Sequence, residues 1–164
     1  EAGSWWLGDL LWKADTTFGA NPKVKKLNAR TKGLIQRLPS EYVGTNVFIG
    51  ASTMSREEIR RRHRNGIDAL MWGTDYPHPE GSWPHTAERL GTDFQQVSIE
   101  DTRLLLGLNA VRCYDLDLAA LTAIAEQVGP RPSDLDQDPQ LRTPPDAIRE
   151  ARWWFDDYGM EWKG

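Results

Sequence analysis

Two short apolar runs without polar alternation mark the middle of the chain. They cover residues 46–51 (Asn-Val-Phe-Ile-Gly-Ala) and residues 69–73 (Ala-Leu-Met-Trp-Gly). Uninterrupted apolar runs of this length are typical of parallel strands that are covered on both faces. Between them, Ser55 and Glu58 form a capping box for a charged helix that ends at Gly66. The order strand, helix, strand predicts a βαβ unit with parallel strands and a right-handed crossover.

Helical patterns flank this unit on both sides. Four polar side chains are expected to accept hydrogen bonds from a following first turn and so to begin helices: Ser4, Ser98, Asn109 and Asp117. The first helix is predicted over residues 5–18, with Gly19 as its stop. A basic stretch with Lys23, Lys25, Lys26, Arg30 and Lys32, followed by Leu34 to Leu38, predicts a second, weaker helix that ends at Pro39. The downstream helices are expected to pack against the sheet.

The composition changes in the last quarter of the chain. Five of the ten prolines lie between Pro130 and Pro145, which is typical of an extended arm. A last helix is predicted from Pro145, with Trp153 and Trp154 as its anchor. The arm and this helix are expected to pack on the rest of the molecule or on a partner subunit. We therefore divide the chain into two parts: residues 1–129 and residues 130–164.

Composition limits the classes of function. The chain has 164 residues, of which 39% are apolar, and a net charge of −4. No apolar run approaches the roughly 20 residues that cross a bilayer, so no membrane partner is expected. The single cysteine, Cys113, excludes an internal disulfide and favours the cytoplasm. The sequence begins at Glu1 without a methionine or a signal peptide, which suggests the middle of a longer chain.

A basic run at residues 60–64 (Arg-Arg-Arg-His-Arg) invites a nucleic-acid interpretation. The same helix carries Glu57 and Glu58, which can pair with Arg61 and Arg62 four residues later. A run with such glutamates is typical of a solvated helix on a barrel exterior, and the net negative charge disfavours polyphosphates. We expect no nucleic-acid partner.

The candidate chemistry lies just after the second apolar run. Catalytic side chains of α/β barrels sit where strands end, and Asp75 and His78 occupy that place here. Gly73 would allow a close backbone approach, and Pro77 would stiffen the turn. Such a pair can bind a divalent metal or move a proton. The alternative is that Asp75 caps a turn and His78 is an ordinary loop histidine.

The wider sequence favours a role for Asp75 and His78 in metal binding or proton transfer. Residues 73–78 (Gly-Thr-Asp-Tyr-Pro-His) resemble the strand-eight segment of amidohydrolase-related enzymes, in the branch that also contains decarboxylases. Residues 105–114 (Leu-Leu-Gly-Leu-Asn-Ala-Val-Arg-Cys-Tyr) are similar to the closing helix of that family, and residues 37–42 resemble it as well. The likeness covers roughly residues 1–129. It implies the C-terminal portion of a (β/α)8 TIM barrel, in which parallel strands are flanked by helices.

The resemblance implies a metal-dependent hydrolase that acts on a small-molecule substrate. Asp75 would contact a divalent metal ion, with Zn²⁺ as the expected metal, and would accept a proton from the metal-activated water. His78 would assist catalysis beside it. In decarboxylating members a similar site orients an aromatic or unsaturated acid for loss of CO₂, so hydrolysis and decarboxylation both stay open.

The chain departs from the family in its metal ligands. The family's His-x-His pair and its middle-strand histidine have no counterpart, because the only histidines are His63, His78 and His85. Glu1 stands near the place of a further family histidine, where it is either a metal ligand or an unstructured chain end. A chain with this incomplete ligand set is expected to be inactive alone.

The eight tryptophans leave one more class of function open. Several lie near the ends of the chain, at Trp5, Trp6, Trp153, Trp154 and Trp162. They could make the chain a non-catalytic interaction module, and a helix with such bulk more often docks on a neighbouring subunit. We therefore expect a homo-oligomer.

Overall fold

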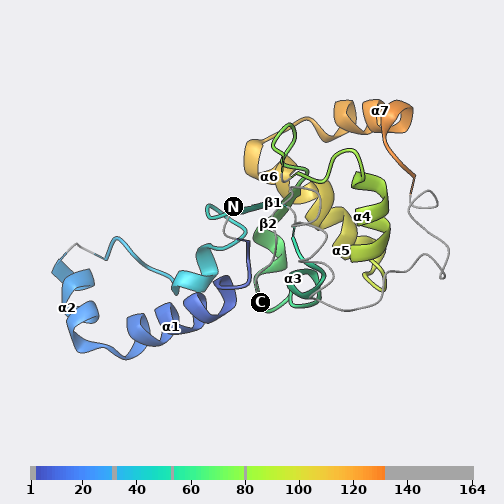
Figure 1. Ribbon diagram of the computed structural model, residues 1–164. Helices are drawn as coiled ribbons and strands as arrows, with labels where there is room; N and C mark the ends of the chain where they lie inside the picture. The colour runs from blue at the N-terminus through green and yellow to red at the C-terminus, as the bar shows by residue number, and fades with distance from the viewer. Residues whose placement is uncertain (1–2, 31–32, 53, 80, 132–164) are drawn as a thin grey trace, which may run out of the picture.

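The computed structural model of the protein describes residues 3–30, 33–52, 54–79 and 81–131 (Figure 1). Glu1, nearly all of the predicted arm, and the terminal helix with Trp153 and Trp154 lie outside these residues. Within them the elements follow one another in this order: α1 (Leu7–Ala20), α2 (Pro22–Arg30), the 3-10 helix η1 (Pro39–Tyr42), β1 (Ile49–Ser52), α3 (Arg56–Arg60), the 3-10 helix η2 (Ile67–Ala69), β2 (Leu70–Gly73), α4 (Thr86–Asp93), α5 (Ile99–Arg103), the π-helical segment η3 (Leu104–Leu108), α6 (Asn109–Tyr114) and α7 (Leu118–Val128).

The two predicted strands pair in parallel, as the apolar runs indicated. Ile49 of β1 lies opposite Leu70 of β2, and Ser52 lies opposite Gly73. The first strand is shorter than predicted, because residues 42–47 form a tight turn in which three backbone N–H groups donate to the carbonyl of Tyr42. Gly44 takes the positive φ of 75° that this turn needs.

The described residues therefore form a mixed α/β fold with a two-stranded parallel sheet. The predicted capping box of the connecting helix is confirmed, since the Ser55 side chain accepts from the backbone N–H of Glu58, and the Glu58 carboxylate accepts from that of Ser55. Figure 1 shows α1 and α2 extending away from the two strands, while η3 packs against β2.

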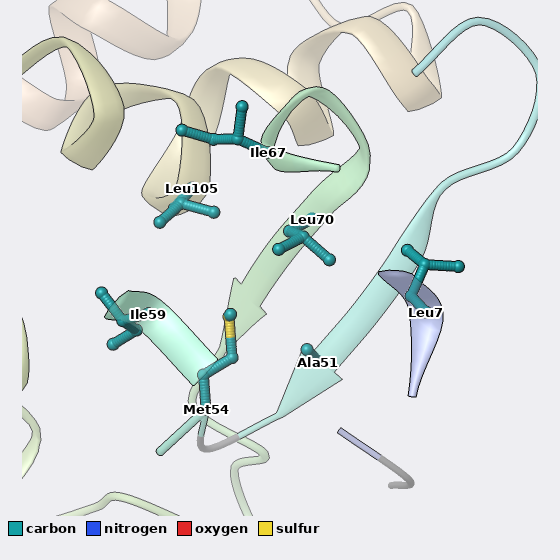
Figure 2. Packing of buried hydrophobic residues seen from close by; sticks show 7 residues of the cluster. All are labelled: Leu7, Ala51, Met54, Ile59, Ile67, Leu70 and Leu105. Atoms are coloured by element: carbon teal, nitrogen blue, oxygen red, sulfur yellow. The ribbon is translucent and has the colours of Figure 1, made fainter. Parts of the chain in front are cut away.

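The core lies between the sheet and the helices that follow it. Its buried side chains come from both strands, the loop before α3, α3, η2, η3 and the start of α1 (Figure 2): Leu7, Ala51, Met54, Ile59, Ile67, Leu70 and Leu105. Within the strands, Ala51 and Leu70 are buried, whereas Gly50 is exposed and Ser52 and Met71 are half-buried. This packing holds β2 in place and so sets where the residues after Gly73 begin.

Two predicted helix caps are wrong. Ser4 is fully buried, and its backbone N–H and hydroxyl both donate to the carboxylate of Glu58. Trp6 occupies the N-cap position of α1, and its side chain makes no capping bond. Asn109 lies inside a continuous helix that runs on from η3, and its amide donates to backbone carbonyls near β2. In both cases the polar side chain bonds to a group that is far away in the sequence instead of capping the helix next to it.

The helix boundaries before the sheet also differ from the prediction. Gly19 lies inside α1, which ends at Ala20, and the second helix is α2 at Pro22–Arg30. Residues 34–38 form bends and irregular backbone instead of a helix, and the Asn28 side chain accepts from the N–H of Ile35 and donates to its carbonyl. The basic part of the predicted second helix is therefore helical, whereas its apolar part before Pro39 is not.

The last described helix, α7, does not pack on the sheet as expected. Its predicted cap is confirmed, since the Asp117 side chain accepts from the backbone N–H of Ala120. Its apolar stripe, however, faces solvent, and Leu118, Leu121 and Ile124 are 48%, 40% and 56% exposed. None of the helices in the described part of the chain has the length and apolar character needed to span a membrane.

Candidate functional site

The loop after β2 is a series of turns closed by backbone hydrogen bonds. The N–H of His78 donates to the carbonyl of Asp75 at 2.7 Å, and the N–H of Gly81 donates to that of His78 at 2.9 Å. The loop then returns to its start, because the N–H of Ser82 donates to the carbonyl of Thr74 at 2.8 Å. These bonds fix the backbone that carries the two predicted catalytic residues.

Close packing inside the loop explains why residue 81 is glycine. A Cβ at Gly81 would lie 2.7 Å from the carbonyl oxygen of Thr74, 3.0 Å from that of His78 and 3.1 Å from that of Asp75. Any side chain at this position would push these backbone atoms apart. Asp75 itself has a positive φ of 59°, a left-handed conformation that aspartate tolerates better than most residues.

Asp75 and His78 lie next to each other, as their place after β2 predicts. Oδ2 of Asp75 is 3.9 Å from Nδ1 of His78, and the two side chains are 28% and 53% exposed. This separation is too long for a direct hydrogen bond. It leaves both groups accessible and close enough to act on one atom between them.

The donor chemistry of this pair fits part of a metal site. Two ligand atoms of a tetrahedral zinc ion with bonds of about 2.0–2.1 Å lie roughly 3.3 Å apart, so the observed 3.9 Å would need only a small movement. Carboxylate oxygen and imidazole nitrogen are both common ligands of divalent metals. Across the described ranges, however, three or more His, Cys, Asp or Glu side chains never gather into a metal-binding group. The pair alone therefore supplies at most two ligands.

The other candidates do not join this pair. His63 lies 3.1 Å from Asp101 and His85 lies 3.9 Å from Glu88, so each has another carboxylate beside it. Glu1 lies outside the described residues. A Cβ at Gly73 would meet only the hydroxyl of Ser52, at 4.0 Å, among this chain's own atoms, so the close approach expected there stays a prediction for a bound group.

Ser82 is a loop residue that sequence reasoning missed. It is 1% exposed, and its hydroxyl lies 3.0 Å from that of Thr86, which begins α4. It therefore ties the loop of Asp75 to the next helix. Two exposed aromatic rings, those of Tyr76 and Trp83, meet edge to face beside it with centroids 5.8 Å apart. A lone serine in a loop carries no sequence signal for such a role.

The basic run is paired with carboxylates from three elements. Arg60 and Arg61 contact Glu57, as their spacing predicts for Arg61. The predicted pair of Glu58 and Arg62 is wrong, because Glu58 is bonded to Ser4 and Ser55, while Arg62 binds Asp101 at 2.7 Å. The last residue of the run, Arg64, pairs with Asp9 of α1.

The comparisons with known proteins identify the family. A family model described as Amidohydrolase matches residues 34–116, which is half of the 164-residue chain. No curated protein and no solved structure matches the chain. The matched residues include both strands, the loop of Asp75 and the helix of Asn109, so they contain the segments on which the resemblance was based. The chain belongs to the amidohydrolase family.

Proposed function

We propose that the protein is a metal-dependent hydrolase of the amidohydrolase type in which Asp75 is the metal-site carboxylate. One observation carries the proposal. Asp75 follows the C-terminal end of the parallel strand β2 by two residues, inside the family-matched region and in a loop closed by its own hydrogen bonds. Carboxylates at that end of a barrel strand face the catalytic mouth.

The roles of the two side chains follow from their chemistry. A divalent metal such as Zn²⁺, when bound, lowers the pKa of water to about 7. The Asp75 carboxylate accepts the proton of the attacking water and then delivers it to the leaving group of a small-molecule substrate. His78, whose Nδ1 is 3.9 Å from that carboxylate, assists beside it by orienting the attacking water or the leaving group.

The remaining ligands of the site would come from other strands. We propose that residues 1–129 form the C-terminal portion of a (β/α)8 barrel, supported by the parallel pair of β1 and β2 and by the helices that follow them. A complete barrel has eight strands, and the described residues contain two. Glu1 is proposed as a further ligand from its place in the sequence.

The decisive experiment replaces Asp75 in the full-length protein loaded with Zn²⁺. We expect Asp75→Asn to lower kcat for ester or amide hydrolysis by about 10²–10⁴-fold, which is the usual contribution of a general acid–base group. The matched control is Asp68→Asn, because Asp68 is an exposed aspartate just before the other end of β2. Unfolding midpoints of both variants should stay within about 1 °C of the parent.

The same assay separates the alternatives. Release of CO₂ from an aromatic or unsaturated acid, lost in Asp75→Asn, would reassign the reaction as decarboxylation. An unchanged rate in Asp75→Asn would instead favour a non-catalytic interaction module. We further propose a homo-oligomeric protein of a reducing compartment without a nucleic-acid partner, and light scattering of the full-length protein tests the first of these.

A further inference from the structure

A polar clasp, built on the buried Asn109 and the exposed Arg112, holds the segment that leads into β2. The side-chain amide of Asn109 donates to the carbonyl oxygens of Ile67 and Leu70, both at 2.7 Å. Arg112, one turn further along α6, donates to the carbonyl of Asp68 and, at 3.0 Å, to Oδ1 of Asn109. Two side chains of one helix thus bind three backbone carbonyls within four consecutive residues.

The clasp uses nearly all of the hydrogen-bonding capacity of Asn109. The residue is fully buried, both amide hydrogens have an acceptor, and the side-chain oxygen has a donor. An aspartate could not donate to the two carbonyls, and a longer side chain would not fit between them without moving the helix. The carbonyl of Leu70 is therefore held at one point relative to α6.

That point controls where Asp75 lies. Leu70 is the first residue of a four-residue strand, and Asp75 is only five residues further along. A slip of one residue at Leu70 would move the chain by about 3.3 Å and turn every side chain of β2 to the opposite face of the sheet. Reacting groups displaced by about 1 Å can lose about 10²-fold in rate.

We propose that Asn109 is a positioning residue for Asp75, acting through the register of β2, with Arg112 holding its amide in the donating orientation. The inference rests on the proposed function. It extends that function to a residue whose described side-chain hydrogen bonds go to Ile67, Leu70 and Arg112.

A double-mutant cycle tests this coupling. Four forms of the full-length protein loaded with Zn²⁺ are compared: the parent, Asn109→Ala, Asp75→Asn and the double variant. Each is assayed with p-nitrophenyl acetate as substrate, at a temperature well below its unfolding midpoint. We expect Asn109→Ala to lower kcat about 10²-fold in the parent with little change in KM, and to cause no further loss in the Asp75→Asn background.

The control separates positioning from loss of stability. Leu105→Ala removes a core side chain from the same helical segment without touching the clasp, and its effect on kcat should be small and equal in both backgrounds. An equal loss from Asn109→Ala in both backgrounds would overturn the inference.

If Asp75→Asn leaves the rate unchanged, the proposed function is overturned but the placement of Asp75 by Asn109 is not yet tested. A second measurement then tests that placement directly. The backbone N–H of His78 donates to the carbonyl of Asp75, so its hydrogen exchange reports the placement of that residue. Asn109→Ala should speed this exchange about tenfold, whereas exposed Asn46→Ala should not. Unchanged exchange in Asn109→Ala overturns the inference whatever the enzyme assay gives.

Discussion

The carboxylate of Asp101 accepts a hydrogen bond from Nε of Arg62 at 2.7 Å, and this pair joins the turn after α3 to α5. Both side chains are 15% exposed, so the pair is better shielded from solvent than the other ion pairs of the basic run. Burial of the carboxyl raises its pKa, but the hydrogen bond and charge of Arg62, together with His63, outweigh this effect and hold the pKa of Asp101 below its usual value.

The lowered pKa predicts a specific loss of stability in acid. A carboxyl whose pKa is lower in the folded state contributes stability that is fully present above its unfolded pKa of about 3.9 and is lost as the pH falls through the folded value. The free energy of unfolding should therefore fall less steeply below about pH 4 in Asp101→Asn than in the parent. Urea titrations between pH 2.5 and 6 measure the slope. Glu100→Gln, which changes an exposed neighbour, should keep the parental slope.

A glycine in the loop of Asp75 gives a second prediction. Gly81→Ala should destabilise the protein by about 1–3 kcal/mol, because the added methyl group would meet three carbonyl oxygens at 2.7–3.1 Å. Gly107→Ala is the matched control. A Cβ at Gly107 meets nothing within 4 Å and the residue is helical, so that change should stabilise by about 0.5–1 kcal/mol. Equal effects in chemical denaturation would refute the packed loop.

Two leucines with different surroundings test the limits of the core. Leu105→Ala should cost about 2–5 kcal/mol, since Leu105 is 1% exposed and lies in the buried cluster. Leu121→Ala on α7 should cost less than about 1 kcal/mol, because Leu121 is 40% exposed. A large effect at Leu121, measured on the same chain by urea unfolding, would mean that its side chain is covered.

The basic run should not bind polyanions. Because Arg60, Arg61, Arg62 and Arg64 each pair with a carboxylate, binding a phosphate would require breaking these pairs. We expect no retardation of a double-stranded oligonucleotide at 50 mM salt. Binding that weakened steeply as salt was raised would contradict this expectation.

Local patterns were enough to predict the βαβ unit. The caps at Ser55, Ser98 and Asp117 depend on atoms three residues away in the chain, so their sequence signals survive folding unchanged. The apolar runs likewise predicted the parallel pair, although the turn after Tyr42 shortened the first strand.

Long-range partners explain what the sequence could not predict. Ser4 and Asn109 have the side chains of helix caps, but their partners lie 54 residues away for Ser4, and 39 and 42 residues away for Asn109. The apolar stripe of α7 predicted burial, but the stripe is exposed. Amphipathic spacing shows which face of a helix is apolar and does not show whether another element covers that face. At the site, the proximity of Asp75 and His78 followed from their spacing in the sequence. The contact between the hydroxyls of Ser82 and Thr86 could not be predicted, because it depends on how the loop folds back.

The carboxylate of Glu58 serves two segments at once. It accepts from the N–H groups of Ser4 and Ser55, and, although burial raises its pKa, these bonds keep the pKa below its usual value. Opening of either segment would strand a partly buried anion, so the two segments should open as one cooperative unit. Amide exchange at Ser4 and at Ser55 should therefore share a single opening free energy, and a protease that cuts near the first segment should also loosen the start of α3.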